Sequence, residues 1–162
     1  MKVLMISKTF LKGHPKAGHP TEFREKIEDA LLGKEDGKKH TIRASNRFKV
    51  GDRVSLRQWS DKPYRSKQVE IAWVTIKEVF DMHFNKTIVD GKKVLHFTIF
   101  DECGEIIFYQ RAIEIDSPFY ELQSGIRKLA NNDGLHGRDF VNWFESYDDF
   151  IGQIICWVDP KY

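Results

Sequence analysis

Two turn signals divide the middle of this chain into short β-strands. The dipeptide Asp90-Gly91 is typical of a tight hairpin turn, and the Asp-Glu-Cys-Gly segment at 101–104 is a second turn. The segments that follow the two turns, 93–100 and 105–110, contain β-branched and aromatic side chains, which favour strands. Because a tight turn joins antiparallel neighbours, the centre of the chain is predicted to form an antiparallel sheet.

The flanking segments predict further strands and three short helices. Thr21 is a suitable N-cap for the first helix, and Ser117 followed by Pro118 at the first helical position is predicted to open the second. The three helices are predicted over 21–32, from 118 to the turn at 131–134, and over 137–146. The strands are predicted over 2–7, 39–44, 53–59, 68–80, 93–100, 105–110 and 152–158. This order predicts an α+β fold, a small mixed β-barrel with about three short helices packed on it, as a single domain over residues 1–162.

The composition limits the chemistry that the chain is expected to perform. With 41% hydrophobic and 13% aromatic residues, it can bury a core. No apolar run approaches the roughly 18 residues of a membrane span, so no membrane partner is expected. Two cysteines, Cys103 and Cys156, are too few for a disulfide framework, and a reducing cytoplasm is the default expectation. The six histidines lack metal-ligand spacing and no cofactor-binding glycine pattern is present, so neither a metal nor a cofactor is predicted.

The charges are distributed unevenly along the sequence. Residues 34–67 contain 11 Lys and Arg against 4 Asp and Glu, whereas residues 101–162 contain 5 cations against 12 anions. A formal net charge of +2 therefore hides a polarised molecule. A phosphate-bearing partner is expected to bind the first half of the chain.

Arg43 is a candidate ligand-binding residue within this basic region. Side chains alternate along a strand, so Arg43 is predicted to share one face of strand 39–44 with Thr41, opposite His40 and Ile42. Its planar guanidinium suits a phosphate or the edge of a base. The alternative is a structural role, in which Arg43 forms a salt bridge with Asp52 or Asp133.

A second candidate surface is an aromatic and basic loop between two predicted strands. Bases of single-stranded RNA stack on aromatic rings while cations hold the backbone. The loop residues with these properties are Trp59, Tyr64, Arg65, Lys67 and Gln68. In the alternative interpretation, Trp59 caps the barrel core and only Tyr64 is exposed.

The segment that begins at Gly37 resembles the ASCH domain family, a relative of the PUA-like RNA-binding fold. The resemblance rests on Gly37, Lys38, Thr41 and Arg43, followed by the Phe-Lys-Val-Gly-Asp turn at 48–52. Further features of the family match Asp133-Gly134, Phe140, Trp143 and Trp157. The resemblance covers most of the chain and implies a PUA-like barrel that binds RNA or nucleotides.

Some ASCH proteins are amidohydrolases that act on N4-acetylcytidine with a Lys, a Thr and an acidic residue. The resemblance implies that these catalytic roles fall on Lys38, Thr41 and Asp133, although the family's acid is Glu and Lys39 is an alternative to Lys38. Such a site is chemically coherent. A buried lysine with a lowered pKa can accept the proton of a threonine hydroxyl, and a carboxyl group can protonate the leaving amine.

The preferred functional prediction is an RNA- or nucleotide-binding domain with a basic cleft around Lys38, Thr41 and Arg43. The alternative is an amidohydrolase that deacylates N4-acetylcytidine-type nucleosides. A ribonuclease is a third possibility, for which the sequence shows no clear acid–base pair. The residues predicted to contact the nucleic acid or nucleotide are Lys39, His40, Arg43, Trp59, Tyr64, Arg65, Lys67 and Gln68.

Overall fold

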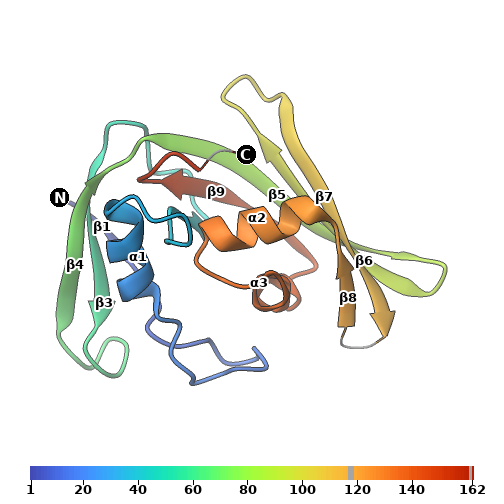
Figure 1. The fold of residues 1–162 in the computed structure, drawn as a ribbon, viewed down its shortest axis with the longest axis horizontal. Coiled ribbons are helices and arrows are strands. Elements are labelled where there is room, and N and C mark those ends of the chain that lie inside the picture. The colour runs from blue at the N-terminus through green and yellow to red at the C-terminus, as the bar shows by residue number, and fades with distance from the viewer. Residues whose placement is uncertain (117–118, 161) are drawn as a thin grey trace.

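The computed structural model describes residues 1–116, 119–160 and 162. The described chain forms an α+β fold with nine strands and three helices (Figure 1). The elements are β1 (Lys2–Met5), α1 (Phe23–Leu31), β2 (His40–Arg43), β3 (Arg53–Trp59), β4 (Gln68–Thr75), β5 (Glu78–Val89), β6 (Lys92–Phe100), β7 (Ile106–Asp116), β8 (Phe119–Leu122), α2 (Ser124–Asn132), α3 (Gly137–Phe144) and β9 (Asp149–Cys156).

The strands form two sheets that curve around the helices. The smaller sheet has the order β1-β3-β4, with β1 parallel to β3 and β3 antiparallel to β4. The larger sheet is antiparallel and has the order β2-β9-β5-β6-β7-β8. In Figure 1 these strands follow a curve like half a barrel, and the three helices lie within it. The predicted small mixed β-barrel with about three short helices is therefore confirmed.

An aromatic cluster attaches α3 to the larger sheet. Phe84 of β5 and Phe97 of β6 have ring centroids 5.1 Å apart, and Phe97 lies 5.4 Å from Phe140 of α3. Phe144, one helical turn later, lies 5.5 Å from Phe84. All four side chains are buried, so this cluster holds α3 in a fixed position on the sheet.

The single strand predicted over 68–80 is wrong, because two strands occupy this segment. The chain leaves the smaller sheet at Ile76, whose N–H donates to Asp52 O at 2.9 Å. Lys77 N then donates to Cys156 O at 2.8 Å, and β5 continues beside β9 in the larger sheet. The sequence shows one continuous β-rich run because both sheets require the same residue types. The later part of β5, up to the confirmed turn at Asp90-Gly91, was not predicted.

The predicted start of the second helix is also wrong. Ser117 and Pro118 lie outside the described residues, and Phe119–Leu122 is the strand β8 rather than a helical turn. β8 pairs with β7, and α2 begins only at Ser124. The transition is fixed by Gln110 of β7, whose side-chain oxygen accepts a hydrogen bond from Gly125 N at 3.0 Å. Cross-strand pairing thus overrides a local helix-start signal.

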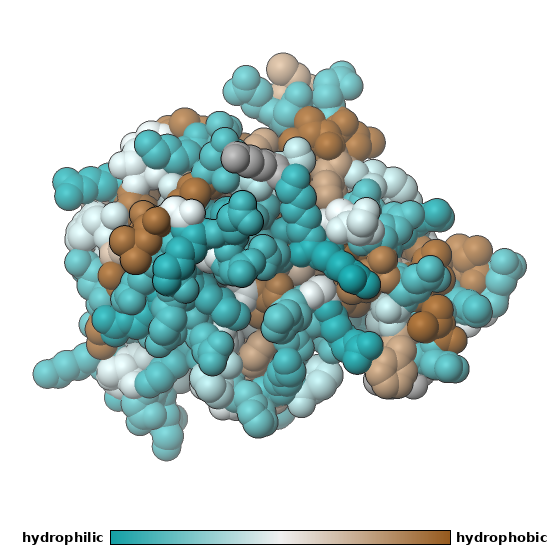
Figure 2. Space-filling view, viewed as in Figure 1, coloured by the Kyte–Doolittle hydropathy of each residue, from teal (hydrophilic) through white to brown (hydrophobic). Residues whose placement is uncertain are grey.

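The molecular face in Figure 2 is mostly hydrophilic. Hydrophobic side chains gather near the two hairpins that project from the larger sheet, β5–β6 and β6–β7, where Ile88 is 64% and Ile106 is 61% exposed. Within the described residues, no helix combines the length and the hydrophobicity that a membrane crossing needs.

Candidate functional site

Lys38 is directed into the protein by close packing on both sides of its backbone. Gly37 faces helix α1 so closely that a Cβ atom there would lie 2.3 Å from the backbone nitrogen of Ala30. Lys38 N donates to Lys26 O at 2.8 Å, and the indole of Trp157 donates to Lys38 O at 3.0 Å. The backbone is thus held between α1 and the segment after β9, and the Lys38 side chain points inward.

The Lys38 ammonium forms an ion pair at the C-terminal end of α2. Its Nζ donates to Asp133 Oδ1 at 2.6 Å and to Asp133 O at 2.5 Å, and it lies 4.1 Å from the ring centroid of Phe23. The negative end of the helix dipole and the aromatic face both favour a cation here. Gly134 adopts φ +77°, and a Cβ on it would lie 2.9 Å from Lys38 Cβ. Glycine at this position therefore makes room for the buried lysine stem.

Burial shifts the pKa values of both partners toward their neutral forms. The desolvation of Lys38 lowers its pKa from 10.5 to about 8, although the neighbouring Asp133 carboxylate opposes this shift. Desolvation raises the pKa of Asp133, against the opposing effects of Lys38 and Arg43. Ionisable groups with pKa values shifted by burial are typical of functional sites and also occur in structural ion pairs.

Arg43 is near enough to Asp133 to oppose the rise in its pKa, but the two form no ion pair in the described residues. Its guanidinium donates to Met5 O at 2.5 Å and to Ile42 O at 3.0 Å. Asp52, the other acid considered as a partner, is bound by Lys2 at 2.5 Å. Arg43 is thus fixed by backbone carbonyl groups, which leaves other guanidinium N–H groups available to a ligand.

Lys38, Thr41, Arg43 and Asp133 line one small pocket. Its remaining walls are mostly apolar: Ile6, Ser7, Phe23, Ile42, Trp143 and Phe144. The cavity measures about 30 Å³, room for about one or two water molecules. In the part of the chain that the structure describes, the Thr41 hydroxyl makes no hydrogen bond. The three residues proposed for catalysis thus line one pocket, together with aromatic rings.

His40 and Lys39 lie outside this pocket, although both were predicted to contact the ligand. His40 is fully buried, and its Nδ1 lies 2.6 Å from the hydroxyl of Tyr162. Its Nε2 lies 3.8 Å from Asp133 Oδ1, and burial lowers the pKa of His40 well below its usual value, which keeps the ring neutral. Lys39 lines a separate groove beside Val158. The structure thus places Lys38, rather than Lys39, in the pocket.

The aromatic and basic loop between β3 and β4 forms a separate surface. None of its predicted binding residues (Trp59, Tyr64, Arg65, Lys67 and Gln68) lines the pocket. Tyr64 is 89% exposed, and its ring centroid lies 5.3 Å from that of the half-buried Trp59. In Figure 1 this loop lies at the end of the smaller sheet, away from α2. A strand of RNA that contacts both regions would have to cross the intervening surface.

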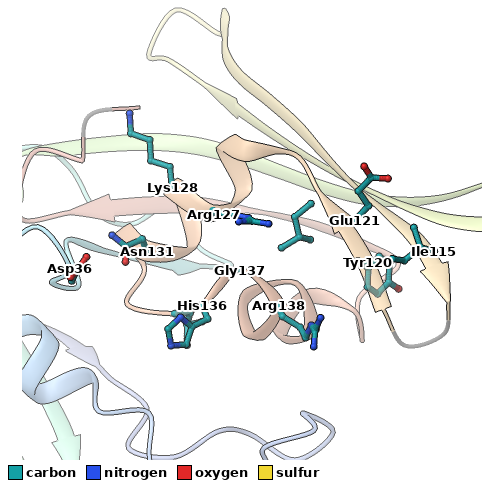
Figure 3. A pocket seen from close by; sticks show the side chains of 12 residues that line it. Asp36, Ile115, Tyr120, Glu121, Arg127, Lys128, Asn131, His136, Gly137 and Arg138 are labelled. Atoms are coloured by element: carbon teal, nitrogen blue, oxygen red, sulfur yellow. The ribbon is translucent and has the colours of Figure 1, made fainter.

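A much larger groove, about 930 Å³, lies between α2, α3 and β8 (Figure 3). Its cations are Arg127, Lys128 and Arg138, but Asp36 and Glu121 also line it. No residue predicted to be functional lines this groove. Its mixed charges indicate no single class of ligand.

Sequence patterns did not identify Phe23 as part of the site. Phe23 falls on the apolar stripe of α1, a position typical of a core residue, and only the tertiary structure brings its ring over the Lys38 ammonium. Among the described residues, no group of three or more His, Cys, Asp or Glu side chains is arranged to hold a metal ion.

Comparison with known proteins adds no assignment. The chain matches no protein-family model, no curated protein and no solved structure. The geometry of the pocket is therefore the basis for a functional proposal.

Proposed function

We propose that this chain binds RNA or a nucleotide and holds one base in the pocket of Lys38, Thr41, Arg43 and Asp133. The observation that carries this proposal is that these four polar residues line one pocket together with Phe23, Trp143 and Phe144. Lysine and arginine donate hydrogen bonds, the carboxylate accepts them and threonine does both. A planar heterocycle with donors and acceptors on its edge matches such a site.

Ligand entry requires the pocket to open. A cavity of about 30 Å³ is too small for a pyrimidine ring, so a wall has to move. Trp143 is the most suitable wall because its indole is only partly buried and lies 5.8 Å from Phe10 in the N-terminal loop. We expect base binding to change tryptophan fluorescence, and Trp143→Phe to remove most of that change. An undiminished change in Trp143→Phe would contradict this route of entry.

Calorimetric titration with cytidine and N4-acetylcytidine tests the binding proposal. Thr41→Val keeps the side-chain volume and removes the hydroxyl, and it is expected to weaken binding by about tenfold or more because a buried polar group of the ligand loses its partner. Thr98→Val is the matched control, because Thr98 is a buried threonine of β6 that does not line the pocket. Equal affinity of the wild type and Thr41→Val would contradict the proposal.

A second candidate function, amidohydrolysis of N4-acetylcytidine, is favoured by the lowered pKa of Lys38. Neutral Lys38 would take the proton of the Thr41 hydroxyl as its oxygen attacks the acetyl carbonyl. The Asp133 carboxylate, which accepts a hydrogen bond from Lys38 Nζ at 2.6 Å, would pass that proton from Lys38 to the departing N4 amine. Water would then hydrolyse the Thr41 ester, releasing acetate and restoring the hydroxyl.

This mechanism predicts a defined pH dependence. Only the neutral amine accepts a proton, and the pKa of Lys38 is about 8, so the rate of cytidine release should rise through pH 8 and level off above it. The measurement is the initial rate across pH 6 to 10, with Thr41→Val providing the non-enzymatic rate at each pH. A rate that is constant or falls over this range would exclude Lys38 as the base.

A further inference from the structure

A second pocket adjoins the first, and Arg43 lines both of them. The second pocket measures about 310 Å³ and lies between β1 and the chain that follows β2. Its lining residues are Val3, Leu4, Met5, Arg43, Ala44, Ser45, Arg47 and Phe48. Arg43 is thus shared between the pocket that contains Asp133 and a larger neighbouring hollow. We call this hollow the arginine pocket.

The arginine pocket is positively charged. Among the described residues that line it, the ionisable ones are Arg43 and Arg47. The Arg47 guanidinium lies 4.9 Å from the ring centroid of Phe48, and Nη2 donates to Val3 O at 3.4 Å, a weak bond. The acid closest in sequence, Asp52, accepts a hydrogen bond from Lys2, so its charge is neutralised. The lining therefore presents two arginines with no acidic side chain among them.

Ser45, which also lines this pocket, has a hydroxyl group without a partner. Ser45 Oγ is buried, and within the residues that the structure describes it forms no hydrogen bond. A buried hydroxyl without a hydrogen-bond partner destabilises the folded protein, and a ligand oxygen that accepts its hydrogen bond would remove this cost. Two guanidinium groups and a hydroxyl donor are the groups that typically bind a phosphate.

We propose that the arginine pocket binds the phosphate of the nucleotide whose base occupies the first pocket. This inference rests on the proposed function and narrows it. The ligand is a phosphorylated nucleoside, either a free nucleotide or one unit of an RNA strand, rather than a free nucleoside. Arg43 connects the two pockets because it lines both, so base and phosphate contact a common side chain.

Titration calorimetry at two salt concentrations tests this inference with three ligands: N4-acetylcytidine, its 5′-monophosphate, and a short single-stranded RNA with the same base at its centre. The monophosphate is expected to bind about tenfold or more tightly than the nucleoside, and this advantage should shrink as salt increases. Arg47→Gln should remove most of the advantage, and Ser45→Ala should reduce it. Arg53→Gln is the charge-matched control, because Arg53 stacks on Trp73 at 5.1 Å and lines neither pocket.

The outcomes separate the inference from the proposed function. Equal affinity for the nucleoside and its monophosphate would contradict phosphate binding in the arginine pocket but not base binding in the first pocket. An advantage that Arg47→Gln and Arg53→Gln reduce equally would also contradict the inference, because general charge would then explain the effect. Binding of none of the three ligands overturns both. An advantage that depends on Arg47 supports the inference, and a further gain with RNA assigns the phosphate to a strand rather than a free nucleotide.

Discussion

Replacing Lys38 with Met is expected to lower the free energy of unfolding by about 3 to 5 kcal/mol. The substitution leaves the buried Asp133 carboxyl without the ammonium that donates to it at 2.6 Å, and α2 loses a hydrogen-bond donor at its C-terminal end. Chemical denaturation of the wild type and the variant measures the difference.

Lys39→Met is the matched control, since Lys39 is the adjacent lysine, is partly exposed and forms no described ion pair. Its expected cost is within about 0.5 kcal/mol. Replacing both members of the pair, Lys38→Met with Asp133→Leu, should recover part of the lost stability, because no unpaired charge then remains. Equal losses in Lys38→Met and Lys39→Met would contradict the buried ion pair.

Gly37→Ala is expected to be the second most damaging substitution, with a loss of about 3 kcal/mol. The new methyl group would lie 2.3 to 2.6 Å from Ala30, and two of the three close atoms belong to the backbone of α1. The segment would have to move away from the helix, taking Lys38 with it. Thermal and chemical denaturation measure the loss in stability, and nucleoside binding should weaken in parallel.

Gly104→Ala separates this steric effect from the intrinsic cost of replacing a glycine. Gly104 has φ +81° and open space where a Cβ would lie, so alanine there should cost about 1 to 2 kcal/mol from backbone strain alone. If Gly37→Ala is no more destabilising than Gly104→Ala, the close packing of Gly37 on α1 is not a constraint on the site.

Elements that a local signal specifies could be predicted from the sequence. β3 has its predicted bounds, and the hairpin turn lies at Asp90-Gly91, where a positive φ of 51° and 74° at the two residues suits Asp and Gly. Elements that form only by pairing with a strand elsewhere in the chain could not be predicted in this way. β8 is a strand because it pairs with β7, and β4 ends where the chain transfers to β9.

The same distinction applies to the site. The sequence points to Thr41 and Arg43 of β2, and both line the pocket, although Ile42, which alternation places on the opposite face, lines it as well. The contact between Lys38 and Asp133 joins residues 95 positions apart, which no spacing rule predicts. His40 has a side chain suited to ligands, but β2 is covered on both faces and the ring is packed against Tyr162. The assignment to the ASCH family stays a prediction.

The most direct test of base binding is a crystal structure of the Thr41→Val variant and of the wild type, each with N4-acetylcytidine. The variant serves to trap an unreacted ligand if the wild type hydrolyses it. The pocket proposal predicts that the base lies against Phe23 and Trp143, with its polar edge toward Lys38, Arg43 and Asp133. A base stacked on Tyr64 in the β3–β4 loop, with the pocket still closed, would contradict it.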